Sequence, residues 1–270
     1  MDRRREVSPV NPPRPPVSVY LRSAAFWCVF FVSTTFFGLL IAIVGWLLPS
    51  RWSYGLARIW CFINIYTLRF ICGLRWRVEG RAKIPTTPHI FFAKHQSTWE
   101  TMALVMLLAP QVHVIKRELL RIPGFGWGYR AMDPIAIDRA AGRAAVEQMV
   151  AQGRERLADG WSVMIFPEGT RVLPGRTERY RMGGAILATE TGVSVLPIAH
   201  NAGEFWPRHS FVKWPGTITV VIGESIATVG KTPDEVNAEA RAWLEATMER
   251  IGGAGPCAAR QEPVRVDQSG

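Results

Sequence analysis

The feature that most constrains this chain is a long uncharged, apolar stretch. No charged residue lies between Ser23 and Ser50, and Arg22 and Arg51 flank the stretch. A helix that crosses a bilayer needs about 20 apolar residues, so this stretch is long enough. It is too long and too internal for a cleavable signal peptide, and no small-x-small cleavage site follows. We therefore expect a membrane helix over residues 23–48.

A second, shorter hydrophobic stretch covers residues 59–74. Only ten residues separate Arg58 from Arg69, which is short for a full span. Two arrangements are open: a helical hairpin that dips into one leaflet and returns, or one full span followed by an interfacial helix. Positive charges on both sides of the first helix leave its orientation undecided. Because Arg69 would be costly at the bilayer centre, we favour the hairpin, with residues 21–74 as a membrane-embedded two-helix segment.

The two ends of the chain have compositions that predict disorder. Residues 1–20 carry Arg3, Arg4 and Arg5 and are rich in proline. They bury little, and their arginines suit an anionic leaflet. Residues 252–270 are rich in Gly, Ala, Arg and Gln, and we expect a second disordered tail there.

The net charge limits the classes of binding partner, and the cysteine spacing limits the possible disulfide and metal sites. The net charge of 32 − 22 = +10 suits anionic lipids, phosphorylated ligands or nucleic acid. No homeodomain, zinc-finger or RNA-binding pattern is present, so nucleic acid is not expected. The cysteines (Cys28, Cys61, Cys72 and Cys257) include no close pair. Their spacing argues against a disulfide framework or a zinc site and fits a reducing compartment. We expect no metal site.

Strand and helix patterns alternate through residues 75–251. Apolar runs predict strands over residues 76–79, 89–93, 112–116, 134–137, 162–166, 194–198 and 217–222. Helical patterns lie over residues 99–108, 140–158, 182–190 and 233–251. This alternation predicts an α/β domain with a mostly parallel central sheet flanked by helices. In such domains ligands gather beyond the carboxyl ends of the strands.

The first polar cluster follows the strand at residues 89–93. His95 lies in the turn after this strand, and Glu100 lies in the first turn of the next helix, where a carboxylate suits the positive helix end. The turn can fold His95 back toward Glu100, whose carboxylate would fix the imidazole tautomer and stabilise its protonated form. A surface histidine beside a helix-capping glutamate is the structural alternative.

The second polar cluster is Lys116 and Arg117, which follow the strand at residues 112–116. A lysine offers a point charge and an arginine offers a fork, and both suit a phosphate. A solvated basic turn is the alternative.

The third cluster, Phe166-Pro-Glu-Gly-Thr-Arg171, follows the strand at residues 162–166. Arg171 can bind a phosphate through two hydrogen bonds. Glu168 can accept a hydrogen bond from a substrate hydroxyl or hold Arg171 in place, and the alternative is a structural Glu–Arg pair. A fourth block, residues 195–201, ends at His200, for which a structural role is favoured over a second base.

These four blocks, in this order, resemble the lysophospholipid acyltransferase family, which includes 1-acyl-glycerol-3-phosphate acyltransferases. The resemblance covers about residues 60–225. Phe-Pro-Glu-Gly-Thr-Arg matches in full, and the block beginning Lys116-Arg-Glu-Leu119 matches well. The departure is Glu100, where the family usually has Asp in its His-x4-Asp block. One extra methylene alters the reach of the carboxylate but keeps its charge.

The resemblance implies transfer of an acyl group from a thioester to a glycerol hydroxyl, without a cofactor. His95 would take the proton of the hydroxyl, and Glu100 would orient His95. The co-substrate would be acyl-CoA or acyl-acyl carrier protein. The implied phosphate- and substrate-binding residues are Lys116, Arg117, Arg139, Glu168, Gly169, Thr170 and Arg171.

The acceptor implied by the resemblance is lysophosphatidic acid, which would give phosphatidic acid. Glycerol 3-phosphate or another lysolipid is the alternative acceptor, and a non-catalytic lipid-binding protein is the non-enzyme alternative. We expect a membrane location, the bacterial inner membrane, in contact with anionic lipids. The donor's location places the catalytic domain on the cytoplasmic side.

Overall fold

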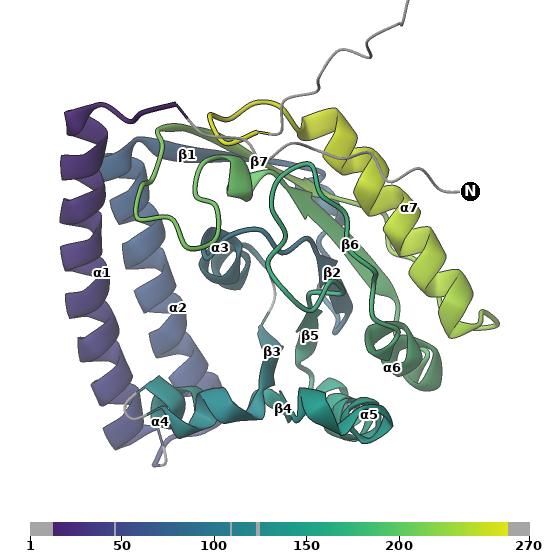
Figure 1. Cartoon of the computed structure of the whole chain (residues 1–270). Helices are drawn as coiled ribbons and strands as arrows, with labels where there is room; N and C mark the ends of the chain where they lie inside the picture. The colour runs from purple at the N-terminus through teal and green to yellow at the C-terminus, as the bar shows by residue number, and fades with distance from the viewer. Residues whose placement is uncertain (1–12, 46, 109, 123–124, 259–270) are drawn as a thin grey trace, which may run out of the picture.

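The computed structural model describes residues 13–45, 47–108, 110–122 and 125–258 (Figure 1). Most of the predicted tails, residues 1–12 and 259–270, lies outside the described residues.

A seven-stranded sheet forms the centre of the molecule, in the order β1-β7-β6-β2-β5-β3-β4. The pairing of β6 with β7 is antiparallel, and the other described pairings are parallel. The predicted α/β fold with a mostly parallel sheet is therefore confirmed. The strands are β1 (Leu74–Glu79), β2 (Ile90–Ala93), β3 (Gln111–Lys116), β4 (Ile135–Ile137), β5 (Ser162–Ile165), β6 (Val195–His200) and β7 (Gly216–Ile222).

Helices flank the sheet and extend beyond it (Figure 1). The α-helices are α1 (Val17–Val44), α2 (Ser50–Thr67), α3 (Trp99–Leu107), α4 (Phe125–Arg130), α5 (Arg143–Ala158), α6 (Gly183–Thr191) and α7 (Pro233–Ile251). A π-helical turn, Leu68–Cys72, continues α2. Short 3-10 turns cover Arg81–Lys83, Arg117–Arg121, Arg139–Ala141 and Ala202–Glu204.

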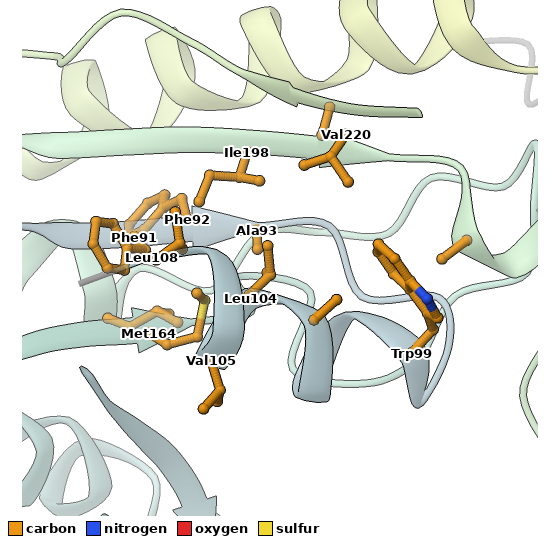
Figure 2. Packing of buried hydrophobic residues seen from close by; sticks show 14 of the residues in the cluster. Phe91, Phe92, Ala93, Trp99, Leu104, Val105, Leu108, Met164, Ile198 and Val220 are labelled. Atoms are coloured by element: carbon orange, nitrogen blue, oxygen red, sulfur yellow. The ribbon is translucent and has the colours of Figure 1, made fainter. Parts of the chain in front are cut away.

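The core is centred on β2, which is buried along its whole length. Phe92 faces α6, because a Cβ on Gly184 of that helix would lie 2.7 Å from the Phe92 ring. Side chains alternate along a strand, so Phe91 faces the opposite side of the sheet. Figure 2 shows β2 between Ile198 of β6 and Met164 of β5, in agreement with the strand register.

The two N-terminal helices differ in extent from the prediction. Helix α1 begins at Val17, after Pro16, and not at Ser23. Residues 17–20, which were predicted to be disordered, therefore belong to the helix. The uncharged stretch that begins at Ser23 marks a candidate membrane segment, but it does not set where the helix begins. Helix α2 begins at Ser50, well before residue 59. Its early turns tolerate Arg51, whose guanidinium donates to the Asp159 carbonyl (2.8 Å) and lies over Trp161.

Both N-terminal helices pack against the α/β domain. Phe26 of α1 meets the Trp206 ring edge-on at 5.6 Å between centroids, and the Trp27 indole donates to the Phe211 carbonyl. Tyr54 of α2 packs edge-on against Trp161. Among the described helices, α1 alone is long and apolar enough to cross a membrane, and 6% of its most apolar window is buried.

The predicted C-terminal tail is ordered at its start. The backbone N–H groups of Gly253, Ala254 and Gly255 donate to the Glu204 carboxylate at 2.7–3.0 Å, and Cys257 is buried. Residues 253–255 of the predicted tail therefore form a turn that the Glu204 carboxylate holds. Composition did not reveal that a buried carboxylate would hold this glycine-rich turn.

Candidate active site

The predicted His95–Glu100 pair forms beyond the carboxyl end of β2. The Nδ1 atom of His95 lies 2.9 Å from Oε1 of Glu100. The same Oε1 accepts the backbone N–H groups of Gln96 (2.9 Å) and Ser97 (2.8 Å). A carboxylate on Nδ1 places the ring proton there and leaves Nε2 as the basic nitrogen. The Ser97 hydroxyl accepts the Trp99 N–H, which is a helix-start contact.

Glu100 is fully buried yet held in its charged form. Burial alone would raise the pKa of its carboxyl, but the histidines His200 and His95 and the N–H group of Ser97 lower the pKa below its ordinary value. Burial lowers the pKa of His200 itself, so we attribute the effect mainly to the hydrogen bonds from His95 and the backbone.

The neighbours of His95 fix its position. Its ring stacks on Phe166, with centroids 4.1 Å apart and planes 20° apart. Its backbone N–H donates to Glu168 Oε2 at 2.8 Å, and its carbonyl accepts the Val172 N–H at 2.7 Å. The third cluster therefore holds the backbone and the ring of the candidate base.

Glu168 also forms a buried ion pair with Lys94, which itself lies 3.0 Å from Glu245. Tyr180 donates to the same Glu245 oxygen at 2.8 Å. The Glu168 carboxylate is thus engaged by Lys94 and by the His95 backbone, and its described contacts do not include Arg171. The sequence analysis did not identify Lys94. A lysine that directly follows an apolar strand was a visible signal, because a buried ammonium group needs a charged partner.

Arg171 lines the same cavity as His95 of the candidate dyad. Its Nη1 atom donates to Thr98 Oγ1 at 3.0 Å, and its carbonyl accepts a hydrogen bond from Arg208. The side chain is half-buried and lines a cavity with Gly169 and the exposed Thr170. The turn that positions His95 therefore also brings a guanidinium group to the cavity wall.

Two arginines that sequence reasoning missed, Arg179 and Arg181, line the same cavity. Gly169 has φ +68°, and a Cβ there would lie 2.4 Å from Arg181 Nε. The missing side chain thus allows Arg181 to lie against the turn. The basic run Arg176-Thr-Glu-Arg-Tyr-Arg181 was the signal that could have found these residues.

The structure does not bring the second cluster into this cavity. Lys116 and Arg117 are exposed at the end of β3, and Arg117 donates to Gln148 Oε1 of α5 at 2.7 Å. Neither residue is part of the cavity wall. Arg139 begins a 3-10 turn, and its side chain lies outside the described part of the structure.

The cavity has a volume of about 1080 Å³ and reaches from His95 to the N-terminal helices. Its apolar wall includes Phe30, Phe37 and Ile41 of α1, Trp60 and Cys61 of α2, and Val146 and Met149 of α5. One end is therefore polar and basic, and the other is apolar. Such a cavity can hold an amphiphile with its polar group beside the dyad.

Two further histidines are held by neighbouring groups, and burial lowers the pKa of both. His200 Nε2 lies 2.8 Å from the Lys94 carbonyl, and Nδ1 accepts the Ala202 N–H, as a structural histidine would. His113 lines the cavity with Nδ1 at 2.8 Å from the Tyr129 hydroxyl. Burial, with the charge of His95, lowers the pKa of His113 to about 4. No group of three or more potential ligands among the described residues could hold a metal.

Comparison with known proteins agrees with this geometry. The Acyltransferase family model matches residues 75–201. A 1-acyl-sn-glycerol-3-phosphate acyltransferase of Pseudomonas aeruginosa is 41% identical over 86% of this chain and 91% of its own length. The chloroplastic enzyme LPAT1 of Arabidopsis thaliana is 30% identical over 74% of this chain and 55% of its own length. The chain therefore belongs to the acyltransferase family and is an acyltransferase.

The fold also matches a solved structure, the 1-acyl-sn-glycerophosphate (LPA) acyltransferase PlsC of Thermotoga maritima. The TM-score is 0.72 at 22% identity, over 87% of this chain and 96% of that one. At this identity the likeness concerns the fold alone.

Proposed function

We propose that this chain transfers a fatty acyl group from an acyl thioester to the 2-hydroxyl of 1-acyl-glycerol 3-phosphate at a membrane surface. The observation that carries the proposal is the His95–Glu100 contact of 2.9 Å, with His95 in the wall of a cavity that Arg171 also lines. The relatives from P. aeruginosa and A. thaliana are 1-acyl-sn-glycerol-3-phosphate acyltransferases, which supports this acceptor.

In the proposed reaction His95 is the general base. Its Nε2 takes the proton of the acceptor hydroxyl as the oxygen attacks the thioester carbonyl. The tetrahedral adduct then collapses, the carbon–sulfur bond breaks, and the protonated imidazole returns the proton to the leaving thiolate. Glu100 stabilises the imidazolium between these two steps. The substrate hydroxyl is the nucleophile, so no covalent acyl-enzyme is required.

The acceptor phosphate would bind Arg171, with Arg179 and Arg181 able to add charge. Gly169 and Thr170 would line the glycerol end, while Glu168 would act by positioning His95. That Lys116, Arg117 and Arg139 contact the phosphate stays a prediction. Lys116 and Arg117 lie outside the cavity wall, so the proposal assigns the phosphate to Arg171. The donor would be acyl-CoA or an acyl carrier protein, whose acidic surface suits a basic chain.

The packing of α1 favours a monotopic membrane attachment. Helix α1 packs against the α/β domain at two separate points: Phe26 meets the Trp206 ring edge-on, and Ile41 lies 3.6 Å from where a Cβ on Gly128 of α4 would be. Contacts with the catalytic domain along one side of α1 favour a helix that lies at the membrane surface over one that crosses the bilayer. We propose that the outer faces of α1 and α2 enter one leaflet, on the cytoplasmic side of the membrane, and that acyl chains reach the cavity from there.

An acceptor series tests the proposed substrate. Purified protein in vesicles would receive a labelled acyl thioester with lysophosphatidic acid, glycerol 3-phosphate or a zwitterionic lysolipid. We expect lysophosphatidic acid to be used best, and Arg171→Gln to raise its KM about 10–100-fold, because a charged hydrogen-bonded pair contributes about 1.5–3 kcal/mol. The zwitterionic acceptor should be less affected. A preference for that acceptor in the parent protein would contradict the assignment of a phosphomonoester group to Arg171.

A further inference from the structure

A second hollow lies on the side of α2 that faces away from the catalytic cavity. It has a volume of about 640 Å³. Gly55, Ile59, Phe62, Tyr66 and Arg69 contribute to its wall. These residues follow one another at alternating steps of four and three, so they form one stripe along the helix. We call this hollow the outer groove. It shares no lining residue with the catalytic cavity.

The outer groove gathers three guanidinium groups, those of Arg58, Arg69 and Arg81. Within the described part of the chain, none of them forms an ion pair with a carboxylate. Arg58 donates weakly to the Met106 carbonyl at 3.4 Å. Arg69 lies over the Trp76 ring, 5.6 Å from its centroid. Three uncompensated cations around one hollow favour an anion, and arginine favours phosphate in particular.

The rim of the outer groove is apolar and exposed. Ile59 is 52% exposed, Phe62 is 49% exposed, and Phe70, just beyond Arg69, is 76% exposed. Helix α1 exposes Phe31, Val32, Phe36 and Ile43 as well. Exposed apolar side chains next to unpaired arginines are typical of a membrane interface, where cations meet headgroups and apolar side chains enter the acyl region. A free phosphate would leave this apolar stripe uncovered.

We propose that the outer groove binds one anionic phospholipid of the membrane. Its phosphate would lie among Arg58, Arg69 and Arg81, and an acyl chain would cover Ile59 and Phe62. Helix α2 then carries two lipid sites on opposite faces, a substrate cavity and a non-catalytic anchoring site. The proposal depends on membrane attachment and not on acyl transfer.

Vesicle flotation of the full chain tests the proposal. The probe is a phosphatidylcholine vesicle with increasing phosphatidylglycerol. We expect the parent to bind more tightly as phosphatidylglycerol increases, and Arg58→Gln/Arg69→Gln/Arg81→Gln to lose most of that gain. One basic residue near an anionic surface contributes about 5-fold, so the loss should approach about 100-fold. Binding to pure phosphatidylcholine should not change.

The control triple is Arg143→Gln/Arg154→Gln/Lys231→Gln, which removes the same charge from exposed sites on α5 and before α7. It should keep most of the phosphatidylglycerol dependence. An equal loss in both triples would mean diffuse charge attraction and would overturn the proposal. So would displacement of bound vesicles by millimolar inorganic phosphate, which would indicate a site for a free anion.

Measuring acyl transfer to a soluble acceptor analogue in detergent distinguishes failure of this proposal from failure of the catalytic proposal, because this assay does not require membrane binding. The groove triple should retain turnover there, because no groove residue lines the catalytic cavity. If the triple does not fold, the single variant Arg81→Gln, on an exposed turn, should still lower phosphatidylglycerol-dependent binding by about 5-fold. An unchanged Arg81→Gln would then overturn the proposal.

Discussion

At the scale of single residues, the reach of Glu100 decides the geometry of the dyad. One carboxylate oxygen accepts hydrogen bonds from His95 Nδ1 and from the N–H groups of Gln96 and Ser97. The glutamate side chain, although one methylene longer than aspartate, therefore contacts His95 directly. The departure from the family's aspartate changes the reach of the carboxylate but retains the contact.

Removing the charge of Glu100 tests its role without changing its size. We expect Glu100→Gln to lower kcat about 10²–10⁴-fold, because a neutral amide would not stabilise the imidazolium. Glu100→Asp keeps the charge and should lose less. Steady-state rates for both variants check this, and equal losses would indicate that packing and not charge matters.

The same carboxyl predicts acid sensitivity. Its pKa is lower in the folded protein than in the unfolded chain, so it stabilises the fold above the unfolded value and this contribution is lost as pH falls through the folded value. The difference in unfolding free energy between the parent and Glu100→Gln should therefore shrink as pH falls below the ordinary value of 4.5. Denaturant unfolding at pH 7 and pH 4 measures it, and a constant difference would contradict the account.

At the scale of elements, local patterns predicted which segments fold, but contacts between distant segments set their extents. Alternating strand and helix patterns identified β2, β3, β5 and the helices between them. The start of α2 at Ser50 could not be predicted from hydropathy, because Arg51 is accommodated by Asp159 and Trp161, which lie just before β5 and far from α2 in the sequence. The antiparallel β6–β7 pair likewise depends on a long loop, residues 201–215, that carries no local sign of direction.

That loop also holds α1 through a buried lysine. Lys213 Nζ lies 3.5 Å from the Trp27 ring centroid and 4.5 Å from that of Trp206, and it donates to the Phe211 carbonyl. Burial lowers the pKa of Lys213 to about 7, while the aromatic faces partly offset that effect. Sequence reasoning had no access to a contact between α1 and residue 213.

Lys213 should make stability depend on pH. Between pH 7 and 10.5 the unfolded chain binds a proton at this lysine that the folded protein does not, so stability rises with pH over that window. Lys213→Met should remove this rise, since the Phe211 carbonyl still accepts the Trp27 N–H. Thermal unfolding in detergent across pH 7–10 checks the prediction. A slope unchanged in the variant would contradict it.

At the scale of the whole molecule, the catalytic domain and the N-terminal helices form one cavity. The sequence predicted two hydrophobic helices and three polar clusters at one sheet edge, and two of those clusters meet at His95. It did not predict that the apolar wall would come from α1 and α2 as well as the domain. The cavity depends on packing between helices that are far apart in the sequence, such as α1 and α5. Neither hydropathy nor motif spacing predicts such contacts.

The central claim is that His95 acts as the base in acyl transfer to lysophosphatidic acid. The most direct measurement supplies lysophosphatidic acid and a labelled long-chain acyl thioester to the parent protein and to His95→Ala, side by side in vesicles. We predict labelled phosphatidic acid from the parent and a rate about 10²–10⁴-fold lower from the variant, with matching thermal stability. Equal product formation by the two proteins would contradict the account.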